Sequence, residues 1–158
     1  MQSKPEGAEL MKCRVVVSLV FVAALGLAGC SIPAGPKALE REATAEDTLP
    51  EPVSLSGVDL DVEPGSARLL ATHEDVKYYG AKSKTGGSAC LYAVPVGLPE
   101  RWRAGCAAVA TGEEILTLTV FDGSEAKLLN DGVDASQQRY QGWTRIHDNV
   151  LVTPAKPR

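Results

Sequence analysis

The stretch VKYYGAKSKTGGSACLYAVPV, residues 76–96, contains two β-prone runs separated by a glycine-rich turn. The first run, 76–83, carries Tyr78 and Tyr79, and the second, 88–96, is apolar and compact. Short runs of this kind, bounded by turn residues, are typical of strands, and a continuous apolar run is typical of a buried one. The sequence therefore predicts an antiparallel hairpin that turns at KTGG.

A second hairpin is predicted further along the chain. Residues 115–121, ILTLTVF, alternate between aliphatic side chains and threonines, which is the pattern of a half-buried strand. DGSE at 122–125 then predicts a turn, and AKLL at 126–129 predicts a returning strand. NDG at 130–132 is another turn signal.

The remaining segments complete a small β-rich domain. DNVLVTP at 148–154 predicts a last strand, whereas 133–142 is compatible with a helical turn or a loop. SARLLATH at 66–73 fits either a short helix capped by Ser66 or a first strand. These four to five strands at hairpin spacing predict a mainly β (β-rich α+β) fold, a single antiparallel-sheet domain over 66–158.

The N-terminal segment has the features of an export signal. Lys12 and Arg14 precede an apolar run at 15–28, VVVSLVFVAALGLA. This run is shorter than the roughly 20 residues that a membrane-spanning helix needs. A basic start, a short apolar core and small residues at its end predict a signal peptide over 1–29.

The signal peptide ends in LAGC, residues 27–30, which resembles the lipobox of bacterial lipoproteins. The resemblance implies that small Ala28 and Gly29 admit the signal peptidase, and that Cys30 becomes a lipidated N-terminus carrying acyl chains such as palmitate. Two or more chains would anchor the protein stably, outside the cytoplasm. The alternative is a chance cysteine after an ordinary signal peptide.

Residues 31–65 differ in composition from both neighbours. They are rich in prolines and acids, and their apolar residues are sparse and show no period. Such a segment buries too little surface to offset the entropy of ordering. We therefore expect a flexible, acidic, Pro-rich tether over 30–65, in which a helix at 37–47, KALEREATAED, would be marginal.

Two cysteines lie in the predicted domain. Cys13 belongs to the signal region, so Cys90 and Cys106 remain once Cys30 is lipidated. An oxidising location favours a disulfide between them, worth about 3 kcal/mol in the chain-entropy picture. The alternative is a zinc site formed with His73 and His147, but none of the four has the close pairing that zinc ligands usually show.

The sequence carries no recognisable catalytic constellation, and we predict neither a catalytic residue nor a cofactor. Ser124 lies in DGSEA, which lacks the G-x-S-x-G pattern of a nucleophile elbow. Glu113 and Glu114 are adjacent, so on a strand they point to opposite faces. His73 and His147 are single histidines near predicted strand ends.

Composition and aromatic content narrow the ligand classes. The net charge of −4 argues against a nucleic-acid partner, because a protein that binds nucleic acid needs Lys and Arg to displace the counterions of the phosphates. Trp102 and Trp143 are candidates for a ligand platform, although core packing is the commoner role of tryptophan in so small a domain.

Most of residues 44–152 is similar to a group of small exported proteins of actinobacteria that have no named activity. The matching stretches are TAEDTLP (44–50), GSARLLATHEDVKYYGAKS (65–83), ACLYAV (89–94), RAGC (103–106), LLNDGVD (128–134) and GWTRIHDNVLV (142–152). The resemblance implies an extracytoplasmic domain with a cysteine pair, and it brings no activity with it.

Two functions from different classes fit these observations. The first is a membrane-anchored, noncatalytic binding or accessory module at the cell envelope, with an envelope protein or ligand as its partner. The second is a small envelope hydrolase that uses His73 or His147. A concave pocket that holds either histidine beside a carboxylate would favour the hydrolase. A solute-binding protein of a transporter is disfavoured because it needs two lobes.

Overall fold

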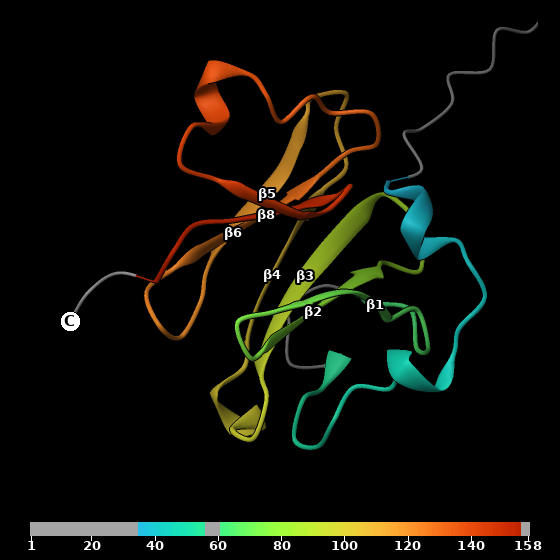
Figure 1. Ribbon diagram of the computed structural model, residues 1–158. Coiled ribbons are helices and arrows are strands. Elements are labelled where there is room, and N and C mark those ends of the chain that lie inside the picture. Colours follow the sequence, from blue (N-terminus) through green and yellow to red (C-terminus); the bar gives the residue numbers. More distant parts are fainter. Residues whose placement is uncertain (1–34, 56–60, 156–158) are drawn as a thin grey trace, which may run out of the picture. The chain divides into compact units, whose positions relative to one another are not determined.

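The computed structural model describes residues 35–55 and 61–155, which belong to one compact unit. These residues form a mainly β domain with two four-stranded antiparallel sheets (Figure 1). The first sheet has the order β1-β2-β3-β4 and the second the order β5-β6-β8-β7. The predicted mainly β, antiparallel fold is thus confirmed. The predicted signal peptide, 1–29, and Cys30 lie outside the described residues.

The strands and short helices within the described ranges have the following bounds. The strands are β1 (Arg68–His73), β2 (Val76–Lys82), β3 (Ser88–Pro95), β4 (Arg103–Ala108), β5 (Glu114–Thr119), β6 (Glu125–Leu129), β7 (Thr144–His147) and β8 (Val150–Val152). The 3-10 helices are η1 (Lys37–Leu39), η2 (Ala45–Asp47), η4 (Pro99–Arg101) and η5 (Gln138–Tyr140). Over 35–55 and 61–155, no helix has the length and apolar character that crossing a membrane requires.

The predicted first hairpin is present as β2 and β3, and β3 is the central buried strand. Alternate side chains of β3 (Ala89, Leu91 and Ala93) belong to the core between the two sheets. The side chains between them (Cys90, Tyr92 and Val94) pack on the opposite side, which we call the outer face of the first sheet. Both faces of β3 are therefore covered, which explains why its sequence is apolar throughout rather than alternating.

The second predicted hairpin is present as β5 and β6. The pairing of β5 with β6 shifts register between Glu114 and Leu116. Because of this irregularity, Ile115 and Leu118 are both buried in the core between the sheets, whereas strict alternation would place them on opposite faces. The predicted last strand is β8, which lies between β6 and β7.

Strands β1, β4 and β7 go beyond the sequence prediction. SARLLATH, for which the sequence left a short helix and a strand open, contains strand β1. The segments RAGCAA and TRIH form β4 and β7, which the sequence did not predict, so the described residues contain eight strands rather than four or five. The segment 133–142 contains the single turn of η5, in line with its interpretation as a helical turn or loop.

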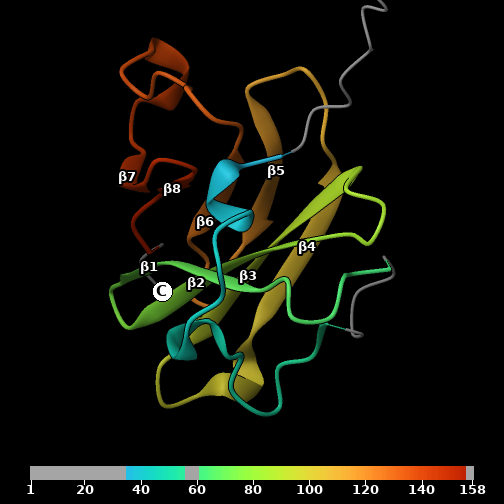
Figure 2. The ribbon, with the colours of Figure 1, turned by 90° about the vertical axis from the view of Figure 1, so that its right-hand side faces the viewer.

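Residues 35–55 correct the prediction of a tether over 30–65. Leu39 is only 2% exposed and belongs to the core between the sheets. A side chain on Gly80 would place its Cβ 2.5 Å from Cδ2 of Leu39, so this glycine makes room for the leucine. The described domain therefore begins at residue 35 rather than at 66. Figure 2 shows the segment, with η1 and η2 lying along the β1 side of the first sheet.

The helix over 37–47, which the sequence indicated would be marginal, does not form as one continuous helix. It is replaced by η1 and η2, two single turns of 3-10 helix separated by residues 40–44. The backbone N–H of Lys37 donates to a carboxylate oxygen of Asp131 at 3.1 Å, which fixes the start of the segment to the second half of the chain. Local helix propensity is thus outweighed by contacts with residues far away in the sequence.

Candidate functional site

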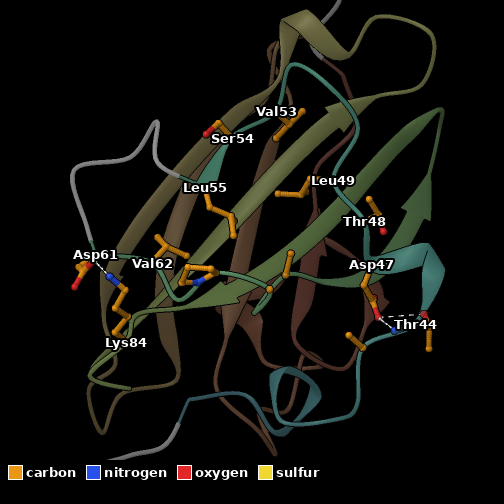
Figure 3. A pocket seen from close by; sticks show the side chains of 14 residues that line it. Thr44, Asp47, Thr48, Leu49, Val53, Ser54, Leu55, Asp61, Val62 and Lys84 are labelled. Atoms are coloured by element: carbon orange, nitrogen blue, oxygen red, sulfur yellow. Dashed lines mark hydrogen bonds and ion pairs between the residues drawn. The ribbon is translucent and has the colours of Figure 1, made fainter.

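Of three cavities in the part of the chain that the structure describes, the most voluminous lies on the outer face of the first sheet, and we call it the outer groove (Figure 3). Its volume is about 850 Å³, within the range of about 300–1,000 Å³ that is usual for small-molecule sites. Two segments that lie before β1 supply most of its lining. The lining residues are Ala43, Thr44, Asp47, Thr48, Leu49, Val53, Ser54, Leu55, Asp61, Val62, Pro64, Gly65, Ala67 and Lys84.

The middle of the outer groove is aliphatic. Leu49, Leu55 and Val62 lie between two polar ends, with Val53 beside them (Figure 3). These four side chains also pack against the outer face of the first sheet, in one cluster with Tyr79, Tyr92 and Val94. The same residues therefore cover the sheet and line the groove.

Asp47 forms one polar end, and its carboxylate is fully engaged within the protein. Its Oδ1 accepts hydrogen bonds from Nη2 of Arg41 at 2.5 Å and from the backbone N–H of Leu69 at 2.6 Å. Its Oδ2 accepts from Nη1 of Arg41 at 2.7 Å, and from the backbone N–H and hydroxyl of Thr44. The Arg41 guanidinium holds the pKa of Asp47 well below its usual range, and the bonds from Thr44 and Leu69 add to this effect.

Lys84 and Asp61 form the opposite polar end (Figure 3). Nζ of Lys84 lies 2.7 Å from Oδ1 of Asp61, and the two side chains are 52% and 73% exposed. An ion pair as exposed as this one contributes about 0–1 kcal/mol, so its partners exchange readily. Lys84 belongs to KTGG, in which sequence reasoning recognised only a turn; no local signal marks it as a lining residue.

A buried tyrosine hydroxyl lies in the cluster beneath the groove. Tyr92 is fully buried, and its hydroxyl has no hydrogen-bond partner among the described residues. Burial raises the pKa of Tyr92 to about 12, so the phenol is neutral. Its ring stacks on Trp102, with a distance of 6.0 Å between ring centroids.

The two tryptophans pack in separate clusters. Trp102 packs with Tyr92 on the outer face of the first sheet. Trp143 packs against Leu129 and Leu151 on the second sheet, with Nζ of Lys127 4.8 Å from the centre of its ring. The two rings do not form a common platform, and core packing describes both.

The structure joins Cys90 and Cys106 by a disulfide, with the two Sγ atoms 2.04 Å apart. The two residues are direct partners on β3 and β4. The bond uses both sulfurs, so neither is a thiolate that zinc would require. Among residues 35–55 and 61–155, no three or more His, Cys, Asp or Glu side chains are placed to hold a metal ion.

The two histidines lie apart from the outer groove. His73 ends β1, and its Nε2 lies 3.8 Å from the carboxylate of its neighbour Glu74. Nδ1 of His147 accepts a hydrogen bond from the backbone N–H of Asn149 at 3.1 Å, and burial lowers the pKa of His147. Neither histidine is among the lining residues of the three cavities described here.

The other polar candidates have partners of their own. Glu113 pairs with Arg139, whereas Glu114 pairs with Lys127 at 2.5 Å, so the two carboxylates have different ion-pair partners. The hydroxyl of Ser124 donates to Asp122 at 2.6 Å within the turn between β5 and β6. Ser124 is therefore a turn residue in the structure.

Comparisons of the chain with protein-family models, with curated proteins and with solved structures give no match.

Proposed function

We propose that the mature protein is a lipid-anchored, noncatalytic binding module on the outer side of the cytoplasmic membrane, which holds a small ligand in the outer groove. The observation that carries the binding role is the groove itself, which combines a volume of about 850 Å³ with an aliphatic middle and polar ends. Small-molecule sites have this character, with mostly apolar walls and a few polar groups that orient the ligand.

The proposed anchor is supported by the sequence LAGC at 27–30, at the end of a basic and then apolar segment. Residues 31–34 alone separate Cys30 from Gly35, where the described domain begins. An extended chain spans at most about 3.6 Å per residue, so an acyl anchor on Cys30 would lie within about 18 Å of Gly35. Such an anchor would hold the domain close to the membrane surface instead of lifting it away.

The location outside the cytoplasm is supported by the cysteine pair. Disulfides such as Cys90–Cys106 persist in oxidising compartments and are rare in the cytosol. A small domain whose described core contains few aromatic side chains also gains more from such a bond than a large one.

The anchor is tested by metabolic labelling with a fatty acid. We expect the parent protein to incorporate labelled palmitate and to fractionate with the membrane. Cys30→Ala should abolish the labelling and leave an uncleaved precursor, because no thiol remains to carry the diacylglycerol. Cys13→Ala, which removes a thiol from the signal region, should label like the parent. Equal labelling of the parent and Cys30→Ala would show that the anchor is elsewhere or absent.

A further inference from the structure

We infer that the outer groove binds a single-chain amphiphile with an anionic head, of the class of long-chain carboxylates. The head lies at Lys84, and the aliphatic chain runs past Val62 and Leu55 toward Leu49. This inference rests on the proposed function, and it adds the chemical class and the orientation of the ligand.

The lining of the groove favours an alkyl chain over a ring. Its apolar side chains are those of leucine, valine, alanine and proline, and the lining residues include no aromatic ring on which a sugar or a nucleobase would stack. Between aliphatic walls, a ligand is bound mainly because its apolar surface leaves water, and this effect has no preferred direction. A flexible hydrocarbon chain satisfies that requirement along the whole middle of the groove.

The two polar ends differ in whether they are available to a ligand. The oxygens of Asp47 already accept hydrogen bonds from Arg41, Thr44 and Leu69, and its side chain is only 3% exposed. Nζ of Lys84, in contrast, has a single exposed carboxylate partner, Asp61, and an ammonium group has three donors. Lys84 therefore keeps donors that an anionic head can use, and the head would compete with Asp61 for an exposed ion pair that is weak.

The arrangement of the ends sets the orientation of the chain. Lys84 and Asp61 lie at one end of the groove, and Thr44 and Asp47 lie at the other, with Leu55 and Leu49 between them (Figure 3). A carboxylate that pairs with Lys84 thus directs its chain across the aliphatic middle. The remote end of the chain comes to lie near the hydroxyl-bearing Thr44 and Thr48.

Photolabelling of the full-length protein in its own membranes tests this assignment. The probe is hexadecanoate with a diazirine in its chain, and the labelled residues are mapped by mass spectrometry of peptides. We expect adducts concentrated at Leu49–Leu55 and Asp61–Pro64. An excess of unlabelled hexadecanoate should suppress them, and hexadecyltrimethylammonium, which has the same chain and a positive head, should not.

A pair of matched variants separates the role of Lys84 from a general effect of charge. Lys84→Glu should reduce labelling of the groove at least fivefold, because it places a negative charge beside the carboxylate head. Lys37→Glu makes the same change at an exposed lysine that lines none of the three cavities, and it should label like the parent. Lys84→Gln, which only removes the charge, should be intermediate. A circular dichroism spectrum and a urea midpoint equal to those of the parent verify that each variant is folded.

Three results would overturn the assignment: adducts absent from the groove, equal protection by the cationic amphiphile, or equal labelling of Lys84→Glu and Lys37→Glu. Labelling of the groove is measured whether or not Cys30 is acylated, because the probe reaches the protein in the membrane fraction and in the soluble fraction alike. Loss of palmitate incorporation without loss of groove labelling would refute the anchor alone. The reverse pattern would refute the ligand class alone.

Discussion

A single hydroxyl on β3 illustrates how individual residues affect the stability of this domain. Tyr92 is fully buried, stacks on Trp102, and has no hydrogen-bond partner for its hydroxyl among the described residues. The ring contributes packing, whereas the oxygen loses its water without a replacement. A buried polar atom in this state costs about 1–3 kcal/mol.

Tyr92→Phe should therefore increase the free energy of unfolding, by about 1 kcal/mol, because it keeps the stacked ring and removes the unpaired oxygen. Denaturation in urea measures the change. Tyr140→Phe is the matched control: the hydroxyl of Tyr140 donates to Glu113 at 3.2 Å, so the same substitution should there lower stability. A loss of stability in Tyr92→Phe would mean that the hydroxyl has a partner.

At the scale of the element, β1 is an edge strand whose backbone is covered by side chains. It pairs with β2 on one side and shifts register between Leu69 and Ala71. At this irregularity, the N–H of Leu69 donates to Asp47, and its carbonyl oxygen accepts from Arg41. One ion pair thus satisfies both backbone groups of Leu69 and joins the 35–55 segment to the sheet. Covering an edge in this way also protects it from pairing with another chain.

The Asp47 carboxylate should make stability depend on acid pH. Its pKa is lowered in the folded protein relative to about 3.9 in an unfolded chain. Its contribution is therefore fully present above about pH 4 and is lost as the pH falls toward the folded pKa. Asp47→Asn should be less stable than the parent at pH 7, and the difference should shrink between about pH 4 and pH 2.

Urea denaturation at pH 7, 4 and 3 follows this dependence. Asp61→Asn is the control, because it changes an exposed carboxylate at the other end of the groove and should alter stability by about 0.5 kcal/mol or less. A constant difference between the parent and Asp47→Asn at all three pH values would contradict the role assigned to Asp47.

The β3–β4 pair joins a strand with strong sequence signals to one with weak signals. β3 is continuously apolar, whereas β4 is RAGCAA, in which alanine and glycine have little preference for strands. Cys90 and Cys106 are direct partners across the pair and form the disulfide. The bond therefore adds a covalent link where side-chain packing alone is weakest.

Replacing both cysteines by serine should lower the free energy of unfolding by about 2–4 kcal/mol, since the unfolded chain regains the freedom of an open loop. Chemical denaturation of the exported protein measures this loss. Reduction of the parent protein should produce a similar loss, and it should leave the double variant unchanged. Alkylation of both thiols without reductant would instead show that the bond does not form in the exported protein.

The same contrast explains how far sequence reasoning reaches at this scale. Both predicted hairpins and the cysteine pair were confirmed, because each has a local pattern in the chain. β4 and β7 were missed, because β4 is rich in alanine and glycine and β7 has only four residues. The outer groove was missed as well: its walls come from segments that looked like a tether, and only their packing on the sheet brings Leu49, Leu55 and Val62 together.

On the scale of the whole domain, irregular segments complete both sheets. The outer face of the first sheet is covered by Leu49, Val53 and Leu55, and the outer face of the second by residues of the 133–143 loop. Each sheet thus has apolar side chains on both of its faces. Within the described ranges, no long helix covers the outer face of either sheet. In such a domain, segments of low apolar content are part of the core.

Leu39 provides the sharpest test of this view. Composition predicted a tether because an average over 31–65 hides one leucine that fits above Gly80, between sheet residues far away in the sequence. If the segment belongs to the domain, Leu39→Ala should cost about 2–5 kcal/mol, the range for deleting a buried leucine side chain. Trypsin should then cleave faster at Lys37 and Arg41. Leu98→Ala makes the same change at a residue that is 45% exposed, and it should cost about 0.5 kcal/mol or less. Equal, small effects of the two substitutions, together with rapid cleavage of the parent at Arg41, would instead show that this segment is a flexible tether.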